Sequence, residues 1–384
     1  MNIILAGIMG RFPYGGVAWC SLMYLRGLAS LGHKVWYLED MHECNFDPVE
    51  DTVSKDPRYA LGFIRSVLEP YGFGDRWCYV DWKEGYHGFT REDWLEVCAR
   101  ADLFINLSGG SWLWRDEYAS IPHSAYIDTD PAFTQLDAAM RPHRLEFLSR
   151  YGSLFTFGRN IGTPLSPVPT GGLHWQHTWQ PVAIDDWQPT GQPPRKTFTT
   201  VMSWKIDSFR EIGGNKDEEF PRFIDLPQHV STLLELAISG PHELLAAHGW
   251  RCRDAFSVSH SPGVYRDYIG SSLGEFSVAK HTYVATNSGW FSDRTECYLA
   301  SGRPAVVQDT GFSAHLPVGE GLLSYTTFEE ARDALEQVAG DYERHARMAR
   351  DLAVAYFASE VVLPPLLARA TSEQSLHAGR EPSR

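Results

Sequence analysis

The sequence predicts an α/β protein of two domains, each built around a parallel, doubly wound sheet. At 384 residues the chain is about twice the usual length of one domain. It opens with a buried-strand pattern at 2–7, a helix-spaced segment at 15–31 and a second strand at 34–38, which is how such sheets begin. Strand-length apolar runs continue to about residue 185 and restart at 197–202, so the pattern occurs twice.

Each half supplies further elements at α/β spacing. In the first half we expect helices and strands at 58–71, 91–100, 102–107, 124–128 and 154–158. In the second half we expect helices at 228–238, 241–248, 263–271, 295–301, 329–338 and 342–357, and a strand at 304–307. Polar residues, prolines and glycines separate the halves at 186–197, which predicts a linker between domains 1–185 and 198–345. The polar segment 371–384 is expected to be a disordered tail.

Composition narrows the class of protein. Hydrophobic residues make up 43% and charged residues 21% of the chain, which is ordinary for a globular protein. The net charge of −14 argues against a surface that neutralises phosphates, so we expect no nucleic acid partner. Six cysteines without a C-x-x-C pair indicate reduced thiols and a cytoplasmic protein. No apolar run approaches the roughly 18 residues of a membrane span.

The most informative segment is 278–309, in which a glycine-bearing loop opens a short helix that ends at Ser301-Gly302-Arg303-Pro304. Backbone N–H groups at the start of such a helix suit a diphosphate, and Arg294 adds a positive charge. Glu296, in the first turn, would accept hydrogen bonds from ribose hydroxyls. An ordinary βαβ element with Glu296 as a helix-terminal charge is the alternative. The neighbouring candidates for nucleotide-sugar binding are Gly289, Trp290, Phe291, Ser292 and Thr295.

This segment resembles the nucleotide-sugar site of glycosyltransferases with the GT-B architecture. The resemblance looks closest to the retaining-type group that includes the spore-maturation-protein-like transferases. It implies two Rossmann-like domains that face a cleft, a nucleotide diphosphate sugar as donor substrate, and neither cofactor nor metal. It also implies that the helical segment 346–370 crosses back to the N-terminal domain. In the retaining group a second glutamate lies eight residues before the ribose-binding one, and here that position is Ser288.

The resemblance assigns roles to the ends of two other strands in the second half. A basic residue after the first strand assists the departing diphosphate in this family, and Lys205 matches it. Ser203, in the same segment, is a further candidate for nucleotide-sugar binding. The alternative for Lys205 is a solvated surface lysine. The family reads the nucleotide base near 258–263, where His260 is the candidate, unless it is an ordinary loop histidine.

In the first half, the loop after the first strand carries Gly10, Tyr14, Gly15 and Gly16. Its spacing is not G-x-G-x-x-G, so a dinucleotide fingerprint is excluded. In the GT-B pattern this loop faces the cleft, where it would approach the acceptor or the sugar; a purely conformational role for the glycines is the alternative.

Asp128 and Asp130 follow the strand residues 124–127 and therefore occupy a crevice position. Either would hold sugar hydroxyls, and Asp130 is our candidate for a general base; a helix cap before Pro131 is the alternative. The pair His174 and His177 lacks further ligands, so we expect no metal site.

We expect a hexosyltransferase-type enzyme that moves a sugar from a nucleotide diphosphate sugar to an acceptor. An aromatic-rich first half suggests a small-molecule acceptor such as a secondary metabolite, and hence natural product biosynthesis; the aromatic residues are Trp112, Trp114, Phe133, Trp175 and Trp179. A nucleotide-sugar epimerase and a non-catalytic nucleotide-binding protein of the same fold are the alternatives. The expected state is a monomer or homodimer.

Overall fold

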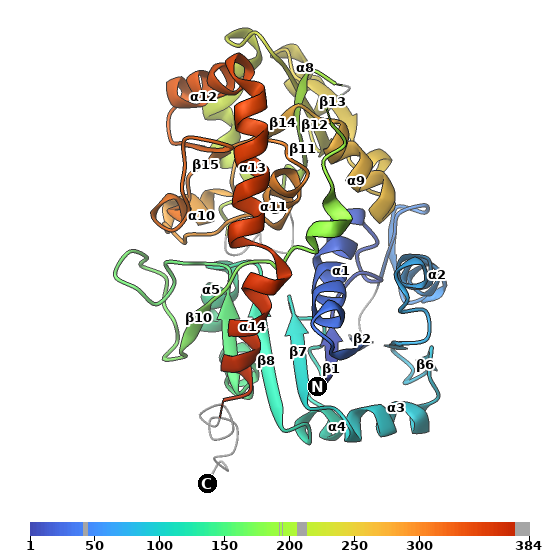
Figure 1. Cartoon of the computed structure of the whole chain (residues 1–384). Coiled ribbons are helices and arrows are strands. Elements are labelled where there is room, and N and C mark those ends of the chain that lie inside the picture. Colours follow the sequence, from blue (N-terminus) through green and yellow to red (C-terminus); the bar gives the residue numbers. More distant parts are fainter. Residues whose placement is uncertain (41–44, 192, 194, 206–212, 373–384) are drawn as a thin grey trace.

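The structure is a computed structural model that describes residues 1–40, 45–191, 193, 195–205 and 213–372. It contains two α/β units, one above the other in Figure 1, with the first residues of the chain in the lower unit. Most of the segment expected to be a disordered tail, from residue 373 onward, lies outside the described residues.

The lower sheet has eight strands in the order β10-β9-β8-β7-β1-β2-β5-β6, and only β6 runs antiparallel to its neighbour. The strands are β1 Asn2–Ala6, β2 Lys34–Asp40, β5 Trp77–Val80, β6 Tyr86–His87, β7 Leu103–Leu107, β8 His123–Asp128, β9 Ser153–Thr156 and β10 Trp175–His177. A separate hairpin pairs β3 (Asn45–Asp47) with β4 (Thr52–Ser54). Because β1, β7 and β8 are parallel, the loops that follow them open at the same edge of the sheet.

The upper sheet has six parallel strands in the order β13-β12-β11-β14-β15-β16. They are β11 Thr197–Ser203, β12 Leu233–Ser239, β13 Arg251–Asp254, β14 Gly274–Ser277, β15 Ala305–Gln308 and β16 Leu322–Tyr325. The expected helix at 228–238 is wrong, because most of this segment forms β12. Its residues Leu234–Ile238 are buried without interruption between neighbouring strands, as in a central parallel strand.

Helices cover both sheets (Figure 1). In the lower unit they are α1 Gly15–Ser30, α2 Arg58–Leu68, α3 Arg91–Ala99, α4 Asp116–Ala119, α5 Phe133–Met140 and α6 Pro142–Ser149. In the upper unit they are α7 Lys216–Glu219, α8 His242–Ala247, α9 Pro262–Ser271, α10 His281–Ala285, α11 Asp293–Ala300, α12 Phe328–Gly340 and α13 Tyr342–Tyr356, followed by α14 Ser359–Ala370.

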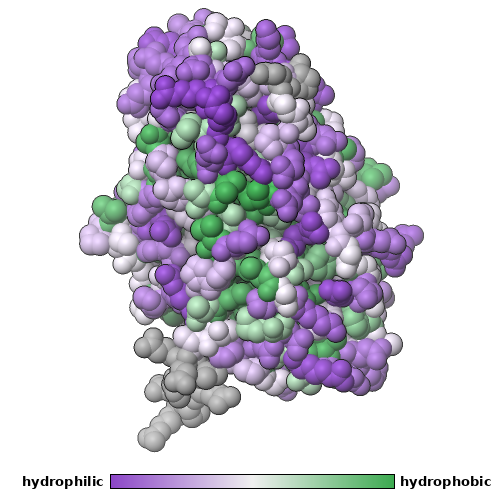
Figure 2. Space-filling view, in the orientation of Figure 1, coloured by the Kyte–Doolittle hydropathy of each residue, from purple (hydrophilic) through white to green (hydrophobic). Residues whose placement is uncertain are grey.

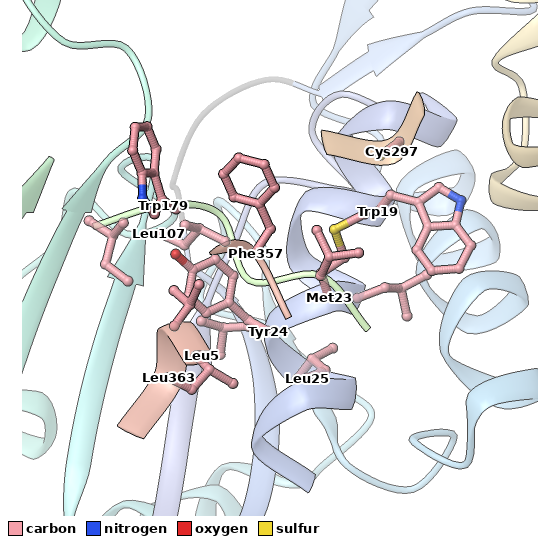
Figure 3. Packing of buried hydrophobic residues seen from close by; sticks show 14 of the residues in the cluster. Leu5, Trp19, Met23, Tyr24, Leu25, Leu107, Trp179, Cys297, Phe357 and Leu363 are labelled. Atoms are coloured by element: carbon pink, nitrogen blue, oxygen red, sulfur yellow. The ribbon is translucent and has the colours of Figure 1, made fainter. Parts of the chain in front are cut away.

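The two units share part of their apolar core. Figure 3 shows α1 residues Trp19 and Met23 packed among side chains that come from both units, including Cys297 of α11 and Phe357. Contacts between α1 and α9 extend the same boundary, and the indole of Trp19 donates to the Pro262 carbonyl at 2.8 Å. A continuous buried boundary of this kind holds the two sheets in a defined orientation.

The chain returns to the lower unit after α13. The amide of Val182 donates to the Phe357 carbonyl at 2.7 Å, and the amide of Ser359 donates to the Val182 carbonyl at 3.0 Å. The following helix, α14, packs against α1 and β8 (Figure 1). Its continuation through Pro364 and Pro365 shows that these residues do not end it.

Polar side chains cover most of the face in Figure 2, and apolar side chains gather across its middle. Val354 of α13 and Val361 of α14 are exposed apolar residues of the C-terminal helices. Within the described ranges, no helix is long and apolar enough to cross a membrane.

Candidate active site

A cavity of about 700 Å³ lies where the loops at the carboxyl ends of both sheets meet. Six basic and three acidic side chains line it, although the whole chain carries a net charge of −14. The charged lining residues are Arg11, Arg141, Arg144, Lys216, Lys280, Arg294, Asp130, Asp137 and Asp293. The cavity is therefore a local site for anions on an acidic protein.

Asp130 and Lys280 join the two units across this cavity. The Lys280 ammonium donates to Asp130 Oδ1 at 2.8 Å, and the hydroxyl of Tyr283 donates to the same oxygen at 2.5 Å. Trp290 stacks on Tyr283 with ring centroids 4.2 Å apart, and its indole donates to the Thr129 carbonyl at 3.2 Å. These contacts fix the loop after β8 against the segment after β14.

The surroundings of Asp130 bear on its predicted role as a base. Burial raises its pKa, but the charge of Lys280 and hydrogen bonds from Lys280 and Tyr283 outweigh burial and hold the pKa below the ordinary value. About 40% of the side chain remains exposed, toward the cavity that it lines. Asp130 is thus correctly placed to meet a ligand, and in this state it is a weak base.

Arg294 lies at the edge of the upper sheet, as expected from its loop. Its guanidinium donates to Glu275 Oε1 at 2.6 Å, to the Val201 carbonyl at 2.8 Å and to Ser277 Oγ at 2.7 Å. Glu275 is fully buried, and its charge helps to raise the pKa of Arg294 against the effect of burial. These partners engage all three nitrogens of the guanidinium, and the residue still lines the cavity.

Lys216 is a basic residue that the sequence did not single out. It begins α7, is only 6% exposed and lines the cavity. No described residue forms a hydrogen bond or ion pair with its ammonium. Burial, together with the charge of Arg294, lowers the pKa of Lys216 well below its ordinary value. A buried amine of this kind gains most from a bound anion.

Lys205 does not take part in the cavity, contrary to the sequence-based expectation. Its side chain is 53% exposed and pairs with Asp217 at 3.2 Å on the surface. Ser203, at the end of β11, does line the cavity. The expectation for Lys205 is wrong because of the direction of its side chain. The end of the strand reaches the cavity, whereas the lysine two residues later points outward.

Glu296 is also displaced from its expected role. It is completely buried, it is absent from the cavity lining, and neither carboxylate oxygen makes a hydrogen bond of normal geometry with a described residue. Burial, with the nearby charge of Asp293, raises its pKa well above the ordinary value, against a smaller effect of the Gln180 backbone. Asp293, one helical turn earlier, lines the cavity instead. Burial also raises the pKa of Asp293.

Some residues of the loop before α11 line the cavity, and others are buried in the apolar core. Trp290 and Ser292 line the cavity. Phe291 is 2% exposed and stacks on Phe357, and Thr295 is 1% exposed, so neither reaches the main cavity. Gly289 adopts a φ of 72°, and its amide donates to the Thr310 carbonyl at 2.7 Å. That amide is therefore engaged within the protein and does not face a diphosphate.

His260 does not line the cavity, in contrast to its neighbour Ser259. The histidine is exposed and lies against Phe256, with ring centroids 5.9 Å apart. His174 and His177 are the pair that we expected not to bind metal. His177 Nε2 lies 2.9 Å from the Ile161 carbonyl oxygen. Among the described residues, no group of three His, Cys, Asp or Glu side chains is arranged to hold a metal ion.

The loop after β1 reaches the cavity through Tyr14 and Gly16. Tyr14 stacks on Phe46 and meets Phe256 of the upper unit edge-on. Gly10 does not line the cavity, because its amide donates to the buried carboxylate of Glu39 at 2.5 Å. Gly15 is a packing residue: a Cβ there would lie 2.5 Å from the Ser261 carbonyl oxygen.

Asp128 is enclosed and unavailable to a ligand, so its expected role at the sugar is corrected. Its carboxylate accepts hydrogen bonds from the side chains of Thr134, Gln135 and Thr156 and from the Asp130 amide. Burial raises its pKa to about 6, against the effect of these donors. Asp128 thus organises the loop that presents Asp130.

Of the aromatic residues expected to contact an acceptor, Trp112 and Phe133 line the cavity. Trp114, Trp175 and Trp179 instead pack in or against the apolar cores. Lys280 could have been predicted from its position at the end of a strand, because it lies three residues after β14. Lys216 had no comparable signal, since it lies 13 residues beyond the end of β11.

No family model matches this sequence, and a search of curated proteins finds no match. Solved structures do match over nearly the whole chain. An alpha-glucosyltransferase in complex with UDP and a 13-mer DNA is 11% identical, with 96% of this chain and 99% of that chain covered and a TM-score of 0.60. AviGT4, a glycosyltransferase involved in avilamycin A biosynthesis, is 15% identical, with 96% of each chain covered and a TM-score of 0.52. Sucrose-phosphate synthase from Thermosynechococcus elongatus is 11% identical, with 95% and 96% covered and a TM-score of 0.52.

These structures correct one expectation. The negative net charge led us to exclude nucleic acid as a partner, but the alpha-glucosyltransferase of similar fold is found with both UDP and DNA. The exclusion was wrong because net charge describes the whole surface, whereas binding depends on the local charge of a cleft. The neighbours named here are GT-B glycosyltransferases, and they do not confirm the spore-maturation-protein-like subgroup. The chain therefore has the GT-B fold, with two Rossmann-like domains that face a central cleft.

Proposed function

We propose that the protein is a glycosyltransferase that moves a sugar from a nucleotide diphosphate sugar to an acceptor held in the cleft. The observation that carries this proposal is the convergence of Lys216, Lys280 and Arg294 on one cavity, at the carboxyl edge of the upper sheet. Three cations at this position suit a diphosphate better than any neutral ligand.

The same cations supply the chemistry of a departing diphosphate. As the bond from sugar to phosphate breaks, negative charge grows on the phosphate oxygens, and fixed cations in a water-poor site stabilise that charge. Arg294 is held in advance by Glu275 and Val201, so little reorganisation is needed. A bound anion would favour the charged form of Lys216, against the effect of burial on its pKa. This set of cations supports transfer without a divalent metal.

Asp293 is our candidate for the ribose hydroxyls, in place of Glu296. It begins α11 on the cavity side, and its carboxylate would accept hydrogen bonds from two neighbouring hydroxyls. Trp290 lines the cavity nearby and offers an apolar surface to the donor.

Asp130 remains our candidate for the acceptor hydroxyl. Of the other carboxylates near the cavity in the lower unit, Asp128 is enclosed, and Asp137 is paired with two arginines. A diphosphate that attracts Lys280 would weaken the Lys280–Asp130 pair. The pKa of Asp130 would then rise, and its strength as a base would increase at the moment when the donor is bound.

Calorimetric titration with the diphosphates of uridine, thymidine, guanosine and adenosine tests the proposal, with EDTA in one series and magnesium in another. We expect saturable binding of one diphosphate that EDTA does not abolish. Binding that appears only with magnesium would contradict a metal-independent site, and no binding of any of them would contradict the donor site itself.

A further inference from the structure

The cavity has a second group of cations, distinct from those assigned to the donor. Arg141, between α5 and α6, and Arg144, in α6, line it from the lower unit, and Arg11 reaches it from the loop after β1. These residues belong to the domain opposite the proposed diphosphate site. Their presence is unexplained by binding of the donor.

The segment 133–148 forms one wall of the cavity. Phe133, Thr134 and Asp137 line the cavity from α5, Arg144 and Leu148 line it from α6, and Arg141 lies between the two helices in extended conformation. Trp112 and Tyr126 of the lower unit line the cavity as well.

Arg144 leaves capacity for an anion on this wall. It shares the carboxylate of Asp137 with Arg141, and its Nε lies 3.2 Å from Asp137 Oδ2. The side chain of Arg144 stays 31% exposed. The guanidinium of Arg144 has more N–H donors than one shared carboxylate can accept.

Arg144 is also held in place by an aromatic ring. Its guanidinium carbon lies 3.9 Å from the ring centroid of Trp112. The ring centroids of Trp112 and Phe147 are 5.0 Å apart. A guanidinium stacked on an indole is fixed in orientation, so its edge remains directed for paired hydrogen bonds to a carboxylate or phosphate. Trp112, Tyr126 and Leu148 supply an apolar surface beside it.

The length of α5 also sets the length that a ligand must have. Lys280 lies 4.9 Å from the ring centroid of Phe133, at the start of α5, next to Asp130. Arg141 follows Phe133 by eight residues, which is about 12 Å along a helix. A ligand that reaches from Asp130 to the arginines must therefore span roughly this distance.

From these observations we propose that the acceptor is an extended apolar or aromatic molecule with a carboxylate or phosphate at one end. Its anionic end would lie between Arg141 and Arg144, and its reacting hydroxyl would lie at Asp130. The proposal rests on the proposed glycosyl transfer for the role of the hydroxyl, whereas the anion site depends only on the geometry of the lower unit.

Binding of 4′-hydroxybiphenyl-4-carboxylate and of its uncharged carboxamide, measured by calorimetry on the full chain, tests the proposal. The two probes differ in charge and share their length and rings. We expect the carboxylate to bind at least tenfold more tightly, and 4-hydroxybenzoate, which is too short to reach both ends, to bind more weakly. The corresponding aryl phosphate distinguishes a preference for phosphate from one for carboxylate. Equal binding of acid and amide would overturn the proposal.

The variant Arg144→Gln should remove the preference for the acid, and Arg144→Lys should restore only part of it, because lysine lacks the planar fork. Arg150→Gln is the matched control, since Arg150 ends the same helix segment and pairs with exposed Glu146. Nucleoside diphosphate binding, measured in parallel, should be the same in all variants. Its failure in the native protein would remove the proposed donor site and leave the test of the anion site intact.

A 13-mer DNA duplex provides the competing outcome. If the duplex displaces the acid and loses affinity in Arg144→Gln, the arginines serve a polynucleotide backbone, and the proposal of a small acidic acceptor is wrong. If the acid binds in an Arg144-dependent way and the duplex does not compete, the proposal stands.

Discussion

Asp130 of the lower domain and Lys280 of the upper domain form a 2.8 Å ion pair across the cleft. The pair is partly buried, with 40% of the Asp130 side chain and 13% of the Lys280 side chain exposed. It therefore joins the two domains through a carboxylate that lines the cavity between them.

The first prediction concerns Asp130→Asn. We expect the transfer rate to fall by about 100-fold or more, which is the usual contribution of a positioned base. Donor affinity should stay the same or increase, because Lys280 loses an anionic competitor. Initial rates and calorimetry on the same preparation measure both effects. An unchanged rate would show that Asp130 is not the base.

A second prediction separates Asp293 from Glu296. Asp293→Asn should weaken binding of the nucleoside diphosphate by fivefold or more, because it removes the charged acceptor of ribose hydrogen bonds. Glu296→Gln should leave affinity unchanged, since the side chain of Glu296 is completely buried and does not line the cavity. The opposite ranking in a titration would restore Glu296 to the site.

The third prediction is a pH dependence of stability from Glu39. Burial raises the pKa of this carboxyl from 4.5 to about 7, despite hydrogen bonds from Gly10, Tyr37 and Arg11. Between these two values the unfolded chain releases the proton and the folded chain retains it, so the free energy of unfolding falls as pH rises. The loss attributable to Glu39 should approach about 3 kcal/mol above pH 7.

Guanidinium unfolding at pH 4.5, 6 and 8 measures this effect. Glu39→Gln lacks the titrating group, so its unfolding free energy should change less over the same range than that of the native protein. Parallel pH profiles for the two proteins would show that Glu39 titrates normally.

A fourth prediction tests the domain boundary at Gly15. A Cβ at this position would lie 2.5 Å from the Ser261 carbonyl oxygen and 2.7 Å from Tyr265 Cβ. Gly15→Ala should therefore cost about 1 to 3 kcal/mol of unfolding free energy. Gly263→Ala, on the neighbouring helix α9 with open space around the added Cβ, is the control. Equal stability of the two variants would indicate that the domains do not pack closely here.

The fold could be predicted from the sequence because parallel strands are short apolar runs with helices between them. The runs at 2–7, 34–38 and 102–107 correspond to β1, β2 and β7. The segment at 228–238 was misread, because the pattern of Leu233, Leu234, Leu236 and Ile238 fits a buried helix as well as a buried strand. Periodicity does not distinguish the two over so few residues.

The residues of the site could be predicted from the sequence only in part. Arg294, Ser203 and Asp130 line the cavity because strand ends and their loops meet there in a parallel sheet. Lys205 and Glu296 were misplaced because sequence position fixes neither the direction of a loop side chain nor which helical turn is covered by another domain. Lys216 depends on the path of the chain between β11 and α7, which no local pattern specifies.

We expect Lys216, which is buried and close to Arg294, to bind the diphosphate of the donor. Calorimetry of Lys216→Ala beside Lys205→Ala measures this, because the two lysines lie 11 residues apart and only Lys216 lines the cavity. We predict that Lys216→Ala weakens binding of the nucleoside diphosphate by tenfold or more and that Lys205→Ala leaves it unchanged. Unchanged affinity in Lys216→Ala would show that Lys216 does not bind the diphosphate.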